Sequence, residues 1–229
     1  MEGSLARLGQ EHHNGHMDRS AQGIDFTQPA DVVAPLLLGA VLRHGGVAIE
    51  LTEVEAYLGT ADEASHAFKG PTPRCEVMFG PPQHLYVYAS YGIHRAGNLV
   101  CSPNGEAGGV LLRAGKVIEG LDIARARRGP KPADEALARG PGNLGAALGL
   151  NLDLNGSAVD QVFSGAGDTS PTAAPFTLTP RMAIPEITRG KRIGITKNAD
   201  ALLRFWAPGD RSVSSPRGRQ LGSPLRPSS

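Results

Sequence analysis

The sequence predicts a single α+β domain, in which helices and strands follow one another without a linker. Two stretches indicate the mixture: residues 27–44 carry apolar side chains at helical spacing, whereas residues 47–57 alternate with the two-residue period of a strand. The 229 residues contain no internal repeat. A hydrophobic fraction of 40% with 20% charged residues is typical of a globular protein, and 30 glycines with 18 prolines predict many loops.

Charge is distributed unevenly along the chain, although the net charge is only +1. Residues 1–66 contain 3 basic and 10 acidic groups, whereas residues 181–229 contain 10 basic and 3 acidic groups, and residues 113–139 contain 7 basic and 4 acidic groups. A chain with this pattern can present a basic face to phosphates, because binding depends on the local field. Residues 1–22 and 212–229 are polar and aperiodic, and we expect a disordered extension and a disordered basic tail.

Cysteine content and hydropathy indicate the compartment. No apolar run reaches the roughly 20 residues that a membrane helix needs, and the first residues lack the apolar core of a secretory signal. Cys75 and Cys101 are the two cysteines, too few for a disulfide framework. They fit a reducing compartment. We therefore expect a cytoplasmic protein without a membrane partner.

The first expected element is a helix from Thr27 to His44. Thr27 can cap it, and Pro29 suits its first turn. Gly45-Gly46 is a typical end of a helix. Its apolar stripe consists of Val33, Leu36, Leu37, Ala40 and Val41.

A strand is expected from Val47 to Tyr57, because apolar and polar residues alternate there. One face begins with Val47, Ile49 and Leu51 and ends with Glu53, Glu55 and Tyr57. A face that changes from apolar to ionisable at the end of a strand suits the floor of a site.

The remaining expected elements follow in chain order. Loops are predicted at 58–75, which contains His66, and turns with short strands at 151–180. Gly129-Pro130 is expected to end the first of two further helices. These helices are Val117–Arg128 and Pro141–Leu148, and the further strands are Leu85–Tyr91, Val110–Arg113, Arg192–Ile195 and Leu202–Trp206.

The four tyrosines of the chain are concentrated in one region of the sequence. They are Tyr57, Tyr86, Tyr88 and Tyr91, in a protein with only 5% aromatic residues. A buried phenol must find a hydrogen-bond partner, so a plain core would favour other side chains. Tyr57, Tyr88 and His66 could form two walls of a slot that stacks a flat polar ligand. Ordinary packing of strands remains the alternative.

Glu55 is the best candidate for a general base, because burial or a nearby like charge from Glu53 would raise its pKa. The same spacing also fits a pair of surface glutamates at a strand end. A metal-dependent hydrolase is a further alternative, using His66, His84 and His94, although their spacing matches no standard zinc pattern. Phosphate-binding, dinucleotide-binding and G-x-S-x-G motifs are absent from the sequence.

Several short motifs occur together in a fixed order. They are E-V-E-A-Y-L-G, D-E-A-S-H-A, T-P-R, L-Y-V-Y-x-x-Y-G-I-H-x-x-x-N, G-V-L-L-R-A, G-P-G-N-L-x-x-A-L-G, R-I-G-I and R-F-W. In number and order they resemble the alkyladenine (3-methyladenine) DNA glycosylase family, from Phe26 to Ser214. The resemblance implies hydrolysis of the N-glycosidic bond of alkylated purines, such as 3-methyladenine and 7-methylguanine, or deaminated purines.

The resemblance also implies roles for individual residues. Glu55 matches the general base that activates the attacking water, Arg113 matches an arginine that helps to hold this water, and the carbonyl of Ile193 matches its third contact. Because no lysine stands at the matching positions, a monofunctional enzyme without lyase activity is implied. Neither a metal nor an organic cofactor is implied.

Five further positions match residues that handle the extruded base. Tyr57, His66 and Tyr88 match the stacking residues around it. Tyr91 matches the residue that intercalates into the DNA in place of the flipped nucleotide, and Asn98 matches a residue that excludes guanine through its 2-amino group. The implied partner is double-stranded DNA with damaged purines, bound by a monomer.

The family's fold implies one compact domain, over residues 23–211, on a curved, mainly antiparallel sheet with flanking helices and without a helix–hairpin–helix element. Its proteins act on nucleoid DNA in bacteria or in the nucleus of eukaryotes. The chain departs from the family pattern at Pro82-Gln83-His84, at Cys75 and at Arg95-Ala96-Gly97. The last change could alter the packing of the pocket, so a protein that binds damaged DNA without cleaving it is the alternative function.

Overall fold

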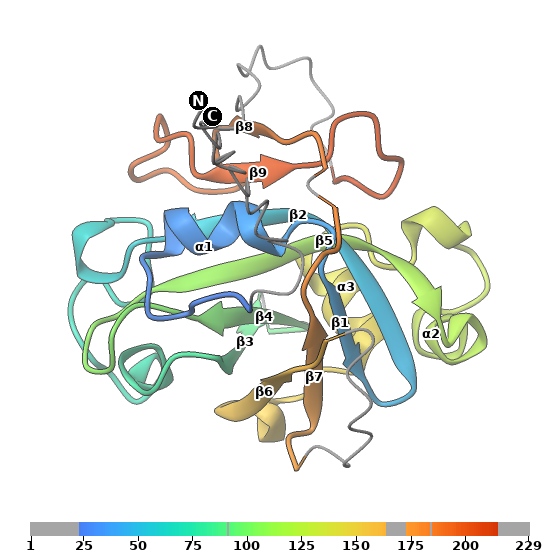
Figure 1. The fold of residues 1–229 in the computed structure, drawn as a ribbon, viewed down its shortest axis with the longest axis horizontal. Helices are drawn as coiled ribbons and strands as arrows, with labels where there is room; N and C mark the ends of the chain where they lie inside the picture. Colours follow the sequence, from blue (N-terminus) through green and yellow to red (C-terminus); the bar gives the residue numbers. More distant parts are fainter. Residues whose placement is uncertain (1–22, 91, 164–172, 184, 215–229) are drawn as a thin grey trace, which may run out of the picture.

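The strands of the described residues form one sheet that closes on itself (Figure 1). The computed structural model describes residues 23–90, 92–163, 173–183 and 185–214. The strands are β1 (Val41–His44), β2 (Val47–Tyr57), β3 (His84–Ser90), β4 (His94–Val100), β5 (Gly109–Glu119), β6 (Ser157–Gln161), β7 (Phe176–Thr179), β8 (Thr188–Gly190) and β9 (Arg204–Trp206). The helices are α1 (Ala30–Leu37), α2 (Leu121–Arg128) and α3 (Pro141–Leu148).

Seven of these strands make a barrel in the order β1-β7-β6-β3-β4-β5-β2, because β2 also pairs with β1. On one edge, β2 pairs with β1 over its first half and with β9 over its second half, where β8 follows. Among these pairs, β6 and β7 are parallel and the rest antiparallel. The predicted α+β class with a curved, mainly antiparallel sheet is confirmed.

The long helix expected from Thr27 to His44 is wrong in its second half. Gly39 turns the chain at φ +82°, and β1 then pairs with β2 and β7. Of the apolar residues that suggested a helical stripe, Val33 and Leu37 are buried on α1 and Ala40 is buried just before β1, whereas Leu36 is exposed. Gly45-Gly46, at φ 55° and 80°, forms the hairpin turn between β1 and β2. Thr27 bonds Asp25 and does not cap α1, which has Pro29 at its N-cap.

Other expectations differ in how far they hold. β2 and α3 have the predicted bounds, and β3 and β9 lie within a residue or two of theirs. β5 runs to Glu119, so α2 begins four residues later than expected. β4 was not predicted, and residues 192–195 form bends in place of the expected strand. Of the segments predicted to be disordered, 1–22 and 212–229, residues 1–22 and 215–229 lie outside the described residues, while residues 212–214 are described and buried.

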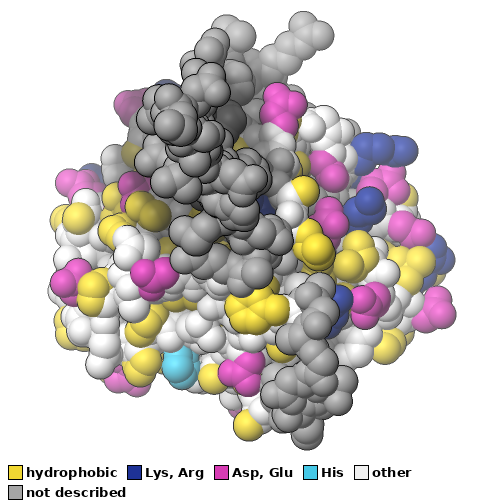
Figure 2. Space-filling model, viewed as in Figure 1, with side chains coloured by type: hydrophobic (Ala, Val, Ile, Leu, Met, Phe, Trp, Pro, Cys, Tyr) yellow, Lys and Arg dark blue, Asp and Glu magenta, His cyan; other side chains and the backbone are white. Residues whose placement is uncertain are grey.

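The helices cover the barrel and complete its core. α1 packs against β2 and β5, while α3 packs against β4 and β5 with α2 beside it. The largest buried side chains include Leu37, Leu42, Leu99 and Phe176. None of the described helices has the length and hydropathy to cross a membrane. On the face shown in Figure 2, acidic and basic side chains are interspersed among apolar ones, so the described part of this face lacks a uniform charge.

Candidate active site

A cavity of about 430 Å³ is lined in part by residues of β2, β3, β4 and β5. This volume is within the range of sites that hold small molecules, about 300–1,000 Å³. The residues that line it include six of the predicted site residues: Tyr57, His66, Tyr88, Asn98, Arg113 and Ile193. Tyr91, predicted to intercalate, lies outside the described residues, so its position is not tested.

One row of paired residues crosses the sheet beneath this cavity. Glu55 on β2 pairs with Leu111 on β5, Leu111 pairs with Asn98 on β4, and Asn98 pairs with Tyr86 on β3. Paired residues of adjacent strands point to the same face of a sheet. The register therefore places the candidate base and the candidate pocket residue in one line, with Leu111 between them.

Glu55 is completely buried beside the cavity. Its Oε1 accepts the backbone N–H of Ile193 at 2.8 Å, and its Oε2 accepts the Tyr57 hydroxyl at 3.0 Å and lies 3.4 Å from Arg113 Nη1. Burial raises the pKa of Glu55, and Arg113, Ile193 and Tyr57 partly offset this effect. The alternative of two surface glutamates is wrong, because Glu53 is completely buried as well.

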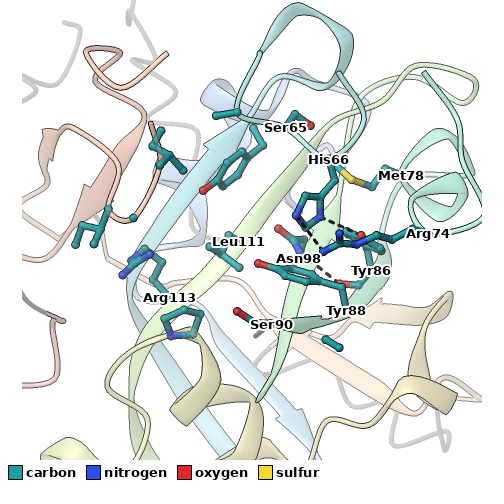
Figure 3. Close-up of a pocket in the computed structure, with 17 residues that line it drawn as sticks. Ser65, His66, Arg74, Met78, Tyr86, Tyr88, Ser90, Asn98, Leu111 and Arg113 are labelled. Atoms are coloured by element: carbon teal, nitrogen blue, oxygen red, sulfur yellow. Dashed lines mark hydrogen bonds between the residues drawn. The ribbon is translucent and has the colours of Figure 1, made fainter. Parts of the chain in front are cut away.

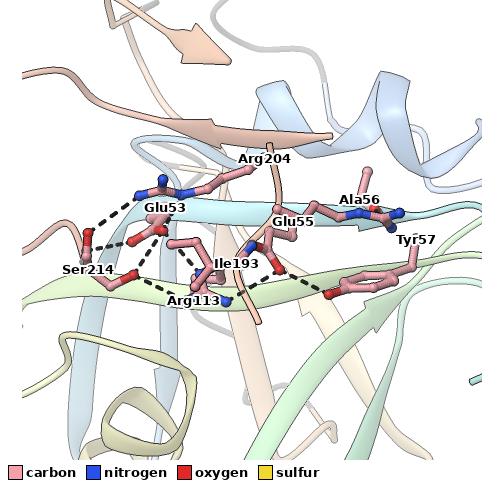
Figure 4. Close-up of polar contacts among 9 residues, drawn as sticks. Glu53, Glu55, Ala56, Tyr57, Arg113, Ile193, Arg204 and Ser214 are labelled. Carbon is pink, nitrogen blue, oxygen red and sulfur yellow. Dashed lines mark hydrogen bonds and ion pairs between the residues drawn. The ribbon is translucent and has the colours of Figure 1, made fainter. Parts of the chain in front are cut away.

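Glu53 and Glu55 share Arg113, although Glu53 has further partners (Figure 4). Arg113 Nε donates to Glu53 Oε1 at 3.1 Å, and Arg204 Nε donates to the same oxygen at 2.6 Å. Two carboxylates and two guanidinium groups thus form a buried cluster whose charges balance. Balanced charges allow ionised side chains to remain inside a protein.

His66, Tyr86 and Tyr88 form one aromatic wall of the cavity (Figure 3). The ring of His66 meets the Tyr88 ring edge-on at 4.6 Å, and the Tyr86 and Tyr88 rings stack at 5.5 Å. His66 Nδ1 lies 3.1 Å from the Tyr86 hydroxyl, and Arg74 donates to His66 Nε2 at 3.5 Å. Because arginine cannot accept a hydrogen bond, this contact favours the tautomer with a hydrogen on Nδ1.

The opposite wall is formed by Tyr57, at the end of β2. Two strands, β4 and β5, separate β2 from β3, so the strands that carry Tyr57 and Tyr88 lie about 14 Å apart across the sheet. Arg192 stacks on the Tyr57 ring, with its Cζ 4.6 Å from the ring centroid. Arg192 in turn is completely buried and donates to both carboxylate oxygens of Asp62, at 2.8 Å to Oδ1. The Arg192–Asp62 ion pair therefore supports one face of the Tyr57 ring.

Asn98 occupies the floor of the cavity and is buried. Its Nδ2 donates to the carbonyl of Tyr86 at 3.4 Å. Arg95-Ala96-Gly97, where the chain departs from the family pattern, precede Asn98 on β4. Glycine fits at position 97, because the Cβ of any other residue there would lie 2.9 Å from Leu150 Cδ1. Leu150 therefore occupies the space that a bulkier residue 97 would need, and β4 keeps its register.

Sequence reasoning did not assign roles to four residues that support the pocket: Tyr86, Arg74, Arg192 and Asp62. Arg74 belongs to the T-P-R motif and Tyr86 to the L-Y-V-Y motif, so their membership in these motifs could have suggested a role. Arg192 was placed on an expected strand, and nothing in the spacing indicated its pairing with Asp62, 130 residues away.

The histidines proposed for a metal site are not gathered in the structure. His84 Nδ1 bonds the carbonyl of Pro82, His94 is exposed, and His66 bonds Tyr86. Within residues 23–90, 92–163, 173–183 and 185–214, no group of three His, Cys, Asp or Glu side chains could hold a metal ion. The histidine-based hydrolase therefore receives no support from the geometry.

Comparison with known proteins identifies the family. The profile of the methylpurine-DNA glycosylase family matches residues 24–211. A protein of Corynebacterium jeikeium is 94% identical over 93% of this chain and 100% of its own length. Proteins of Corynebacterium glutamicum and Cutibacterium acnes are 55% and 56% identical, each over 85% of this chain and over 97% and 99% of their own length. All three carry the provisional name 3-methyladenine DNA glycosylase.

With these matches, the fold and the site define the class of protein as a DNA glycosylase, a hydrolase of N-glycosyl bonds. The chain belongs to the methylpurine-DNA glycosylase family. The resemblance deduced from the ordered sequence motifs is thereby confirmed.

Proposed function

We propose that the protein removes alkylated purines, and deaminated purines, from double-stranded DNA by hydrolysis with a water molecule that Glu55 activates. The observation that carries the proposal is the position of Glu55: a buried carboxylate hydrogen-bonded to Tyr57 and Ile193, both of which line the aromatic cavity. The names of the relatives support 3-methyladenine as a substrate.

Binding must begin with extrusion of the damaged nucleotide, since a base inside a duplex cannot reach the cavity. Extrusion costs a few kcal/mol and is easiest for damaged bases. Stacking between Tyr57 on one wall and His66 with Tyr88 on the other offsets this cost, at about 1–3 kcal/mol per stacked base. The insertion of Tyr91 into the vacated space belongs to the same proposal and rests on its place in the motif.

In the chemical step, the water oxygen bonds C1′ of the sugar and Glu55 accepts its proton. The bond between C1′ and the purine nitrogen breaks, and its electron pair leaves with the base. An N3- or N7-alkylated purine carries a positive charge, so it leaves as a neutral molecule without further protonation. The products are the free base and an abasic site.

The electrostatics of the site suit this step. Burial raises the pKa of Glu55, which makes the carboxylate a stronger base, while Arg113 at 3.4 Å favours its ionised form. The transition state resembles an oxocarbenium ion, and a nearby carboxylate stabilises its positive charge. In this proposal Arg113 also holds the water oxygen, as the resemblance implies.

Replacement of Glu55, the proposed general base, tests the proposal. Glu55→Gln should lower the single-turnover release of 3-methyladenine from methylated duplex DNA by about 100- to 10,000-fold, the usual contribution of general base catalysis. Its affinity for a duplex with one lesion should persist, because the stacking residues are unchanged. Glu50→Gln, on the same strand but paired to β1 and not lining the cavity, is the matched control and should retain activity.

The assay also separates the alternative function. A wild-type protein that binds the lesion-bearing duplex but releases no base would be a damage-binding protein, and the proposed hydrolysis would be wrong. Excision by Glu55→Gln at the wild-type rate would remove Glu55 from its proposed role.

We also propose that the protein acts as a monomer on DNA in the cytoplasm. The buried free thiols of Cys75 and Cys101 are consistent with a reducing compartment. Sedimentation with and without a lesion-bearing duplex would test the stoichiometry, since a monomer should form a 1:1 complex.

A further inference from the structure

Glu53 is a buried carboxylate for which the proposed reaction has no use. Four bonds converge on it: Arg113 Nε, Arg204 Nε and the Ser214 hydroxyl donate to Oε1, and the backbone N–H of Ser214 donates to Oε2 at 2.6 Å. Such complete satisfaction is needed to keep an ionised carboxylate inside a protein. The residue is therefore fixed in one orientation by groups from three separate parts of the chain.

The bonds of Arg113 show what this arrangement determines. Its Nε donates to Glu53 and its Nη2 donates to the Ser214 hydroxyl at 3.2 Å, while Nη1 lies 3.4 Å from Glu55 Oε2 (Figure 4). A guanidinium group is planar and rigid, so two fixed nitrogens determine where the third one points. Glu53 and Ser214 thus direct a single nitrogen of Arg113 toward the proposed base.

Ser214 reaches this position because the preceding residues are anchored. Ser212 and Ser214 are both buried, and the Ser212 hydroxyl lies 2.7 Å from the Thr52 hydroxyl on β2. The sequence had placed residues 212–214 at the beginning of the basic tail. In the structure Ser212 contacts Thr52 of β2 and Ser214 hydrogen-bonds Glu53, so the end of the described domain takes part in the buried cluster.

We propose that Glu53, together with Ser214, is a positioning residue that holds Arg113 at the correct distance and orientation for Glu55. The inference rests on the proposed function, in which Glu55 is the base. Glu53 itself contacts neither the water nor the nucleotide.

The charges around Glu55 predict how the loss of Glu53 would act. Glu55 is faced by Tyr57 and Glu53 from β2, by Arg113 from β5 and by the Ile193 N–H. Without the Glu53 charge, Arg113 and Arg204 would have Glu55 as the remaining carboxylate of the cluster. The pKa of Glu55 would fall, and a carboxylate with a lower pKa is a weaker base.

The test measures single-turnover release of 7-methylguanine from duplex DNA as a function of pH. This base is already cationic, so the acid limb reports ionisation of the base catalyst and not protonation of the leaving group. Glu53→Gln should lower the plateau rate about a hundredfold, the loss that a small misplacement causes, and Ser214→Ala about tenfold. Glu53→Gln should move the acid limb to lower pH because a negative charge beside Glu55 is lost, whereas Ser214→Ala should move it to higher pH because a loosened Arg113 lowers the pKa of Glu55 less. The affinity of both variants for the duplex should stay within twofold of wild type.

Gln161→Leu, on β6, is the control, because it removes part-buried hydrogen bonds to Ile24 and Gln83 without touching Glu53, Arg113 or Ser214. It should lower the thermal midpoint as Ser214→Ala does, but leave the acid limb in place. If Glu53→Gln does not fold, Ser214→Ala carries the test. An unmoved acid limb in the folded variants, even with a lower rate, would show a merely structural role and overturn the proposal.

The ionisation of Glu55 can also be followed without DNA, from the carbon-13 shift of its carboxyl group. A higher pKa in Ser214→Ala than in wild type supports the positioning role, and an unchanged or lower pKa contradicts it. This readout separates the two proposals: if the wild type releases no base, the proposed function fails, while the NMR titration still decides whether Glu53 and Ser214 control the charge beside Glu55.

Discussion

The hydroxyl of Tyr57 donates a hydrogen bond to Glu55 Oε2 at 3.0 Å. A residue expected only to stack on the flipped base is therefore also bonded to the proposed catalytic carboxylate. Burial and the nearby Glu55 raise the pKa of the Tyr57 hydroxyl well above its ordinary value. The phenol consequently remains protonated, and it remains a donor, at neutral and mildly alkaline pH.

Tyr57→Phe separates the two roles of this residue. The ring remains available for stacking, but Glu55 loses a bond that lowers its pKa, so the pKa of Glu55 should rise. The acid limb of excision should then move to higher pH, opposite to the shift expected for Glu53→Gln. Rate–pH profiles on the 7-methylguanine duplex would measure it, and a shift to lower pH would contradict the assigned bond.

Tyr57→Leu is the companion variant, because it removes the ring as well as the hydroxyl. It should weaken binding of the lesion-bearing duplex by about 1–3 kcal/mol, the contribution of one stacked base. Tyr57→Phe should bind as wild type does. Equal binding by all three proteins would show that Tyr57 does not stack on the base.

Asp62 should be important for stability because it neutralises Arg192 behind Tyr57. Both side chains are completely buried, and removing one partner of a buried ion pair costs about 3–5 kcal/mol. Asp62→Ala should therefore lower the free energy of unfolding by this amount in urea titrations at pH 7. Asp200→Ala breaks the exposed pair with Lys191 and should leave the urea midpoint unchanged.

The contribution of Asp62 should also depend on pH. Burial alone would raise its pKa, but the bonds from Arg192, Asn198 and Ala64 together hold the pKa below its ordinary value of 3.8. A carboxyl group with a lowered folded-state pKa stabilises the protein above its unfolded-state pKa, and this stability is lost as the pH falls through the folded-state pKa. The difference between wild type and Asp62→Asn should thus be constant near neutral pH and shrink in acid.

Sequence periodicity could predict those elements whose neighbours in the chain determine them. The alternation in β2 and the proline and glycines around α3 give the correct bounds, because both patterns are local. The helix expected at 27–44 fails because Ala40 to His44 pair with β2 and β7, and β7 lies more than 130 residues away. A two-turn apolar segment fits either element, and partners distant in sequence decide between them.

The candidate site was predictable in part for a related reason. The spacing of Glu53, Glu55 and Tyr57 already placed them on one face, and the structure brings the first two to the same arginine. The support of Tyr57 by Arg192 was not predictable, because it depends on a loop without periodicity. The contacts of Ser214 were not predictable either, because it lies in a segment rich in Ser, Pro and Arg that resembles a disordered tail.

His66 should stay neutral over the working pH range. Partial burial and then the charge of Arg74 lower its pKa to about 4. Since its folded-state pKa is below the ordinary value of 6.5, the unfolded chain binds the proton more readily between these two values. Stability should therefore increase with pH through this window, and be lost again as the pH falls through the folded-state pKa.

Arg74→Gln tests the cause of this shift. It removes the cationic neighbour, so the pKa of His66 should move upward, which an NMR titration of the imidazole carbons would measure. Lys69→Gln removes a positive charge from the same loop without contact to His66, and should leave the titration unchanged. An identical titration in wild type and Arg74→Gln would assign the low pKa to burial alone.

Asn98 should set the limit on which purines enter the cavity. Its side chain is held over the floor by the bond to the Tyr86 carbonyl, in line with Leu111 and Glu55. Guanine has a 2-amino group that adenine and hypoxanthine lack, and a fixed side chain at this place would oppose it. 7-Methylguanine has the same group, but its positive charge makes it a much better leaving group, so the opposition should matter most for unmodified guanine. Asn98→Ala opens this space and should raise the release of unmodified guanine about tenfold relative to wild type, the lower end of what one small steric difference provides.

Asn98→Leu keeps the same number and branching of side-chain heavy atoms without the amide, so it should still exclude guanine if the exclusion is steric. Measuring free guanine released from undamaged duplex DNA by the three proteins would decide the matter: unchanged release by Asn98→Ala would remove Asn98 from this role, and high release by Asn98→Leu would assign it to the amide's hydrogen bonds.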